Sequence, residues 1–124
     1  MSAGTLTGLF FDAVERFASH PAAFRYKTEG GTWQSVSHRE VEERVRAISV
    51  GLRELGISPG DRVAILSETR LEWTLTDYAC LCARVADVPI YPTLPANQVN
   101  TSCATRARRP FSARPPRRWR RSVR

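Results

Sequence analysis

The alternation of apolar and polar positions predicts an α/β arrangement over the first 99 residues. Apolar residues recur on one side of a helix over about residues 6–19, with acidic and other polar residues opposite. Because that polar face is acidic, we expect the helix to dock on the protein rather than on a membrane surface. Residues 22–27 and 32–36 predict a hairpin closed by two glycines. Trp33 is expected to pack across it, with stacking on a base or an acyl chain as the alternative.

The segment after the hairpin predicts a long helix with a capped start. Ser37 and Glu40 have the spacing of a capping box, and Gly56 stands where a left-handed residue ends a helix. His38, in the first turn, is expected to be solvated. The expected apolar stripe contains Val41, Val45, Ile48, Leu52 and Leu55, and the expected ion pairs are Glu40–Arg44 and Glu42–Arg46.

A strand–helix–strand pattern follows. Residues 63–66 are apolar without alternation, which indicates a strand buried on both faces of a parallel sheet. Thr69 and Glu72 predict a second capping box, which opens a helix that runs to about Ala83. Residues 87–91 predict a second strand, so the unit is a βαβ crossover. Since both strands lack their usual neighbours, we expect open hydrogen-bonding edges and apolar faces.

Cysteine usage and the lack of targeting signals predict a cytoplasmic protein. The cysteines are Cys80, Cys82 and Cys103, an odd number that matches no zinc or redox spacing, so we expect reduced thiols. Cys80 and Cys82 are expected to pack within a helix. No apolar run approaches the roughly 18 residues that a transmembrane segment needs. Asp12 and Glu15 argue against a transit peptide.

The one position in the sequence suited to a ligand is the loop of residues 67–70. It lies at the carboxyl end of a predicted parallel strand and at a helix N-terminus, where open α/β sheets bind anions. The loop has no glycine, and Glu68 repels a phosphate, so capping explains its residues better than phosphate binding does. No glycine-rich phosphate loop, metal-ligand cluster or Ser/His/Asp set occurs. We therefore predict no catalytic, cofactor-binding or metal-binding residue in this chain.

The order of several segments resembles the amino-terminal region of AMP-forming acyl-CoA synthetases. These segments are residues 24–26, residues 32–37 followed by Glu40, residues 51–56, residues 60–73 and residues 88–95. The acyl-adenylate-forming superfamily shares the Gly-Asp-Arg-Val strand entry. The Glu-Trp helix and the Val-Pro-Ile-Tyr-Pro-Thr segment look most like its long-chain fatty acid–CoA ligases. The resemblance covers about residues 6–99, and it implies that the fold is the incomplete N-terminal part of the large adenylate-forming domain.

The resemblance also implies a reaction for the complete enzyme. It would activate a fatty acid with ATP and Mg²⁺ to an acyl-adenylate and then transfer the acyl group to coenzyme A. The family's phosphate loop, its acidic and aromatic motifs and its catalytic lysine lie beyond the point where this chain ends, and Lys27 matches none of them. This chain alone is therefore expected to be inactive. Arg84 departs from the family, which usually has a small residue there, often glycine.

Charge divides the chain at about Asn100. Residues 1–99 hold ten basic and twelve acidic side chains, whereas residues 100–124 hold nine arginines, no lysine and no acid. One interpretation is a cationic arm that binds nucleic acid or an acidic partner, with Trp119 or Phe111 stacking on bases. The arginines concerned are Arg106, Arg108, Arg109, Arg114, Arg117, Arg118, Arg120, Arg121 and Arg124.

The other interpretation is that residues 100–124 are translated out of frame. After Asn97-Gln98-Val99 the family typically continues Glu-Tyr-Ile-Leu, a polar pair and Ser-Gly-Ala. Glu-Tyr-Ile-Leu-Arg-Asp-Ser-Gly, written in GC-rich codons and shifted by one base, reads Asn-Thr-Ser-Cys-Ala-Thr-Arg-Ala, as in residues 100–107. GC-rich codons also account for a basic tail that lacks lysine. We favour this hypothesis, in which residues 1–99 are part of a synthetase domain and residues 100–124 a disordered Arg-rich tail.

Overall fold

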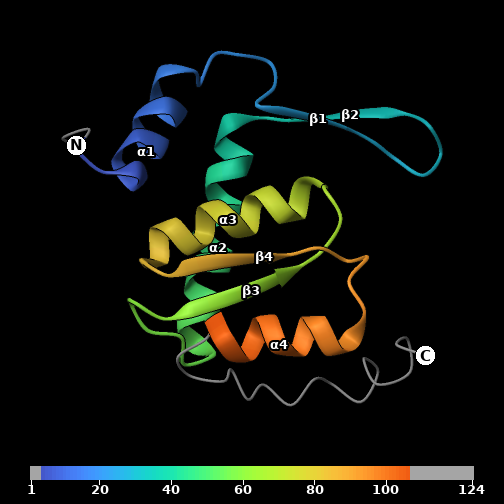
Figure 1. The fold of residues 1–124 in the computed structure, drawn as a ribbon. Helices are drawn as coiled ribbons and strands as arrows, with labels where there is room; N and C mark the ends of the chain where they lie inside the picture. Colours follow the sequence, from blue (N-terminus) through green and yellow to red (C-terminus); the bar gives the residue numbers. More distant parts are fainter. Residues whose placement is uncertain (1–3, 107–124) are drawn as a thin grey trace.

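The computed structural model describes residues 4–106, which form two small sheets and four helices (Figure 1). The elements are α1 (Leu6–Arg16), β1 (Phe24–Lys27), β2 (Trp33–Val36), α2 (His38–Glu54), β3 (Arg62–Leu66), α3 (Leu71–Ala83), β4 (Ala86–Ile90) and α4 (Ala96–Arg106). Strands β1 and β2 pair antiparallel, with Phe24 opposite Val36. Strands β3 and β4 pair in parallel, with Ile65 opposite Pro89. The predicted α/β class, hairpin, long helix and βαβ unit are confirmed.

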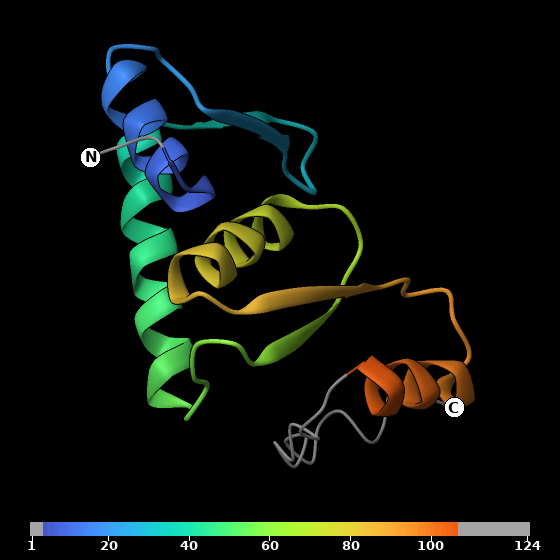
Figure 2. The same ribbon diagram turned by 60° about the vertical axis from the view of Figure 1, so that its left-hand side comes forward.

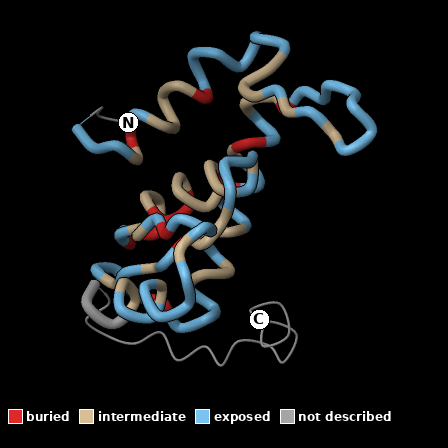
Figure 3. The backbone as a smooth tube through the Cα atoms, turned by 45° about the vertical axis from the view of Figure 1, so that its right-hand side comes forward, coloured by how far each residue is buried: buried red, intermediate tan, exposed pale blue. Residues whose placement is uncertain are grey.

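The core lies where α2 and α3 pack against each other. One buried cluster joins both helices to the end of the hairpin and contains Val36, Val41, Val45, Leu75 and Ala79. A second cluster lies under the loops that enter β3 and β4 and contains Ile57, Cys80, Ala83 and Val85. Buried segments are few in the tube view, and most residues of the strands are half-buried or exposed (Figure 3).

Helix α2 begins and ends as its sequence predicts. The Ser37 hydroxyl accepts a hydrogen bond from the Glu40 N–H at 3.3 Å, and the Glu40 carboxylate accepts one from the Ser37 N–H at 2.8 Å. These bonds from Ser37 lower the pKa of Glu40. At the other end Gly56 has φ 84°, and the Ile57 N–H donates to the Leu52 carbonyl at 3.1 Å. This is the Schellman arrangement that satisfies the last carbonyls of a helix.

The capping box predicted for α3 is wrong. Arg70, not Thr69, is the N-cap residue, and no side chain caps the helix there. The helix therefore begins one residue later than expected, so Glu72 stands at the second helical position, where it cannot complete a capping box. Its carboxylate accepts a hydrogen bond from the Arg70 guanidinium at 2.8 Å instead.

Two predicted contacts of the first half of the chain are also wrong. Leu55 is 69% exposed, because it stands at the C-cap of α2. Trp33 lies opposite Lys27 in the hairpin and is 66% exposed, and its packing across the hairpin stays a prediction. Glu40 binds Ser37, and Arg44 acts on it only through its charge. The other predicted pair, Glu42–Arg46, is confirmed at 2.7 Å.

The exposure of β3 follows from the small size of its sheet. Only Ile65 of β3 is buried, so the prediction of burial on both faces is wrong, while that of open edges and apolar faces is confirmed. Helix α4, which was not predicted, crosses the charge boundary at Asn100 and lies on the side of the strand pair away from α3 in two views (Figures 1 and 2). Residues 107–124, which hold most of the tail, lie outside the described residues.

Arg84 ends α3 in the left-handed region, with φ 60° and ψ 38°. It is the one non-glycine residue with positive φ in the described part of the chain. This conformation explains why glycine suits the position, because a Cβ is strained there. The side chain itself is exposed, so Arg84 does not disturb the packing between α3 and β4.

Replacing Arg84 by glycine is expected to stabilise the fold by about 0.5–1 kcal/mol, because the strain of the Cβ is relieved. The midpoint of urea unfolding, followed by circular dichroism, measures the change. Arg44→Gly is the matched control: Arg44 is an exposed arginine inside α2, so this variant should lose about 1 kcal/mol. Equal losses in both variants would contradict the role of backbone strain at Arg84.

The two predicted capping boxes provide a second matched pair. Ser37→Ala is expected to destabilise the fold by about 1 kcal/mol, because the Glu40 N–H loses its acceptor. Thr69→Ala should change the free energy of unfolding by less than about 0.5 kcal/mol, since Thr69 is exposed and does not cap α3. Urea unfolding measures both variants, and a larger loss of stability in Thr69→Ala than in Ser37→Ala would contradict the structure.

Candidate functional site

The loop between β3 and α3 lies where the sequence placed a possible anion site. It begins after Leu66 and ends at Arg70, the N-cap of α3. The Ser67 hydroxyl donates to the Glu68 carbonyl at 3.0 Å, and Glu68 itself is exposed. A helix N-terminus attracts anions because its first N–H groups have no partner in the helix.

A carboxylate of the chain itself occupies this position. Hydrogen bonding to its own backbone N–H lowers the pKa of Glu72, and the Arg70 guanidinium lowers it further. Arg70 and Glu72 also form an ion pair at 2.8 Å. Since Glu72 fills the anion position and Glu68 adds a second negative charge, the loop does not fit a phosphate.

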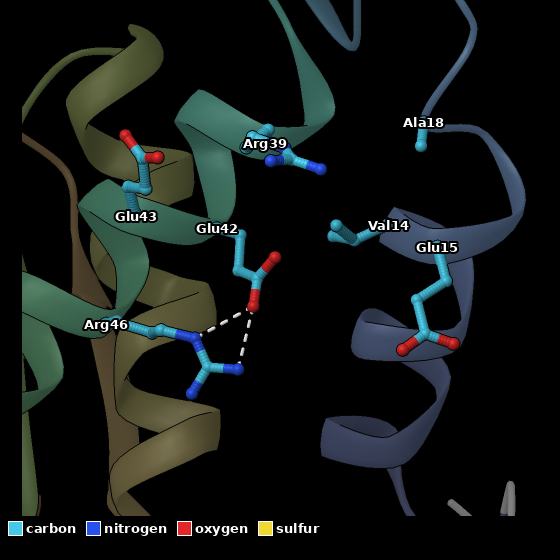
Figure 4. Close-up of a pocket in the computed structure, with 7 residues that line it drawn as sticks. All are labelled: Val14, Glu15, Ala18, Arg39, Glu42, Glu43 and Arg46. Carbon is cyan, nitrogen blue, oxygen red and sulfur yellow. Dashed lines mark hydrogen bonds and ion pairs between the residues drawn. The ribbon is translucent and has the colours of Figure 1, made fainter.

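A cleft of about 470 Å³ separates α1 from α2 (Figure 4). Its lining residues are Val14, Glu15, Ala18, Arg39, Glu42, Glu43 and Arg46. Val14 points from α1 toward α2, and the Arg46 guanidinium binds the Glu42 carboxylate through two nitrogens (Figure 4). Arg46 also lies over the Phe11 ring, 4.5 Å from its centroid. Arg46 therefore connects α2 to α1 by a cation–π contact.

The charges of this cleft suit a docked helix better than a ligand. Three carboxylates and two guanidinium groups line it, so neither an anion nor a cation finds a surface of opposite charge. On its other side α1 is held by the Thr7 hydroxyl, which donates to the Leu81 carbonyl of α3 at 3.1 Å. The expectation that α1 docks on the protein is confirmed, and the cleft is the open part of that contact.

Two carboxyl groups and a thiol meet between α3 and β4. Burial raises the pKa of Asp77, and the charge of Asp87 and a hydrogen bond with it raise that pKa further. Burial also raises the pKa of Cys80 to about 11, with further contributions from Asp87 and Asp77. A thiol with this pKa stays protonated at neutral pH, so Cys80 is a packing residue and not a nucleophile. The prediction that Cys80 packs within the helix is confirmed.

His38 is half-buried and not fully solvated as the sequence predicts. Its ring lies 6.0 Å from that of Phe17 and 6.5 Å from that of His20, measured between centroids. The His38 Nδ1 atom is buried without a hydrogen-bond partner. The chain returns after α1 and brings Phe17 over the first turn of α2, a long-range contact that the local pattern around His38 does not reveal.

Metal-ligand clusters and membrane-spanning helices are both lacking within residues 4–106. No group of three or more His, Cys, Asp or Glu side chains that could hold a metal ion occurs in that range. No helix there is long and apolar enough to cross a membrane. The three cysteines are free, as expected. The arginines predicted to bind nucleic acid lie, apart from Arg106 in α4, outside the described residues, so that interaction stays a prediction.

Removing one charge of the Asp77–Asp87 pair is expected to stabilise the fold to an extent that depends on pH. Because folding raises the pKa of Asp77, its contribution to stability is fully present below the ordinary value of 3.8 and is lost as the pH rises through the raised value. Asp87→Asn should therefore raise the free energy of unfolding at pH 7 and change it little near pH 3.

Urea unfolding at both pH values measures this difference. Glu29→Gln, in the exposed hairpin turn, removes one negative charge elsewhere and should change stability at neither pH. The double variant Asp77→Asn/Asp87→Asn should gain less free energy of unfolding than the two single variants gain together, because the two groups interact. A loss of stability in Asp87→Asn at pH 7 would contradict the unfavourable pairing.

Comparison with known proteins places the chain among larger relatives. A family model described as "AMP-binding enzyme" matches residues 10–106. A relative named long-chain-fatty-acid–CoA ligase FadD15, from Mycobacterium bovis, is 45% identical over 69 residues, which are 56% of this chain and 12% of FadD15.

Solved structures share the fold over a similar range. CmiS6 superposes with a TM-score of 0.72 and 24% identity, over 81% of this chain and 25% of CmiS6. The N-terminal subdomain of Klebsiella oxytoca NpsA superposes with a TM-score of 0.68 and 19% identity, over 81% of this chain and 25% of that subdomain. The match thus covers a quarter or less of the length of each of these three proteins.

Proposed function

The chain belongs to the AMP-binding enzyme family, and from that premise we propose that it is the amino-terminal part of a fatty acyl-CoA ligase. The observation that supports this most directly is the 45% identity to a long-chain-fatty-acid–CoA ligase over 69 residues. The α/β fold of residues 4–106 agrees with it, since CmiS6 and the NpsA subdomain have the same arrangement. The complete protein would convert a long-chain fatty acid to its coenzyme A thioester.

The chemistry of that reaction would reside outside this chain. Activation joins the fatty-acid carboxylate to the AMP part of ATP and releases pyrophosphate, and the coenzyme A thiol then displaces AMP. Both steps need cationic groups and N–H donors around phosphates. Neither of the two candidate sites offers these groups without competing carboxylates, because Glu72 fills the N-terminus of α3 and the α1–α2 cleft holds more carboxylates than guanidinium groups. ATP, Mg²⁺ and coenzyme A therefore do not fit this part alone.

This part would instead supply structural support for the site. Helices α2 and α3 pack on each other, and α3 also packs on the entrances of β3 and β4. The carboxyl end of β3 leads through the loop of residues 67–70 into α3. Ligands of open α/β sheets bind at this end of the strands. We infer that this chain by itself is inactive, and that its role in a complete ligase is to form one margin of the domain.

The proposal extends to the tail. A shift of reading frame near codon 100 accounts for the change from a slightly acidic to a wholly cationic sequence and for the lack of lysine. The alternative is a small non-enzymatic protein whose arginines bind nucleic acid or an acidic partner. It rests on the nine arginines of residues 100–124, which would attract phosphates whatever their origin.

Sequencing and correcting the gene tests both parts of the proposal. A one-base change near codon 100 should restore Glu-Tyr-Ile-Leu and a long open frame. The product should then form long-chain acyl-CoA in a reaction that requires ATP and coenzyme A, while the 124-residue chain forms none. If no one-base change gave a long open frame, the frameshift hypothesis would be wrong. If the corrected enzyme acted only on other carboxylic acids, the assignment of a fatty-acid substrate would be wrong.

Deletion of residues 100–124 tests the alternative. Any binding of RNA or DNA by the full chain should be independent of sequence and should weaken steeply as salt rises from 50 to 200 mM, on the order of tenfold or more. Sequence-specific binding that is lost with the tail would favour the nucleic-acid function over the ligase fragment.

A further inference from the structure

The β1–β2 hairpin has one face on the core and one face away from it. Val36 belongs to the cluster between α2 and α3, and Phe24 and Tyr26 pack against that cluster. Side chains alternate between the two faces of a strand, so the residues between these lie on the opposite side. This outer face of the hairpin consists of four exposed residues in two cross-strand pairs, Arg25 with Ser35 and Lys27 with Trp33.

The outer face combines two cations with one aromatic ring. Lys27 and Trp33 are directly opposite each other, which places their Cβ atoms about 5 Å apart. Arg25 lies two residues before Lys27 on the same strand, a rise of about 7 Å. Within residues 4–106 neither cationic side chain has a hydrogen-bond or ion-pair partner, and the Trp33 ring makes no ring contact. A large apolar ring, 66% exposed, is thus left in water beside two unpaired charges.

The shape of the hairpin favours a broad and flat partner. The hairpin projects away from the helices in both ribbon views (Figures 1 and 2). Small molecules bind in concave sites that bury most of their surface, and a projecting two-stranded face does not provide such a site. A single nucleic-acid strand needs a groove and several aromatic platforms for successive bases, whereas the outer face has one aromatic residue. The surface of a lipid bilayer is flat and can receive a projecting element.

We propose that the outer face of the hairpin docks the chain on a lipid surface that contains anionic phospholipids. Tryptophan is typical of the membrane–water interface, because its ring is apolar and its N–H needs a polar partner. Arg25 and Lys27 lie beside Trp33, where each positive charge is attracted by anionic headgroups. Glu29 in the turn opposes this attraction, but the two cations outnumber it. Docking of this kind is independent of the ligase assignment, because the lipid is bound and not converted.

Binding of the full 124-residue chain to vesicles tests the docking. The probes are phosphatidylcholine vesicles with and without about 30% phosphatidylglycerol, at about 0.15 M salt. Since the arginines of residues 100–124 attract anionic lipid in every variant, the comparison is between matched variants. Trp33→Ala should lower the partition coefficient by about tenfold, because its ring no longer leaves water. Leu55→Ala removes a similarly exposed apolar side chain at the far end of α2 and should change the coefficient by less than about twofold.

Three charge variants should have effects of different sign on the anionic vesicles. Lys27→Gln should lower the partition coefficient by about fivefold, because one attracted charge is lost. Glu29→Gln should raise it by about the same factor, because one repelled charge is lost. Arg53→Gln is the matched control: Arg53 is exposed in the last turn of α2, and its removal should change the coefficient by less than about twofold. On pure phosphatidylcholine all three variants should bind as the wild type does.

Fluorescence shows whether the hairpin itself reaches the lipid. Phosphatidylcholine with brominated acyl chains, added to the anionic vesicles, should quench the emission of the wild type more than that of Trp33→Ala. Trp73 and Trp119 are present in both proteins, so the difference reports on Trp33. Circular dichroism checks that each variant keeps its helices, which is expected because the replaced side chains are exposed.

Several outcomes would overturn the proposal. Equal partition of wild type and Trp33→Ala, or wild-type partition of Lys27→Gln, would show that residues 100–124 alone bind the vesicles. Equal quenching of wild type and Trp33→Ala would show that the outer face stays in water. If Trp33→Ala bound vesicles normally but bound single-stranded DNA more weakly, the outer face would be a contact for nucleic acid and not for lipid.

Discussion

The packing of α2 against α3 is the contact on which the rest of the fold depends. Val45 and Ala79 are fully buried in it, and Val36 brings the end of the hairpin into the same cluster. Phe10 of α1 packs on the outside of this cluster, so all elements before β3 meet there. In the second cluster, Cys80 lies together with Val85 and so connects α3 to the entrance of β4.

The sequence predicted the elements well because their signals are local. The Ser37–Glu40 capping box, the stripe that begins at Val41 and the glycine at position 56 each act within one or two turns. The errors concern properties that depend on neighbours in space. Trp33 and Leu55 are apolar in a regular pattern, yet both are exposed, Leu55 because it stands at the C-cap of α2.

The candidate site was harder to predict, for a related reason. The loop of residues 67–70 could be placed from the strand–helix order, but the one-residue shift in the start of α3 changed its chemistry from capping by Thr69 to an ion pair of Arg70 with Glu72. Contacts between distant segments left no local signal. The pairing of Asp77 with Asp87 and the contact of Phe17 with His38 depend on how α3, β4 and the end of α1 come together.

Pro89 gives the strand pair a direction of growth. A sheet that can be extended at both edges can add copies of itself without limit and form fibres. A strand that approached β4 at Pro89 would find no N–H donor there, so continuous pairing along β4 is unfavourable. A single proline thus works against the growth of fibrils from this strand pair.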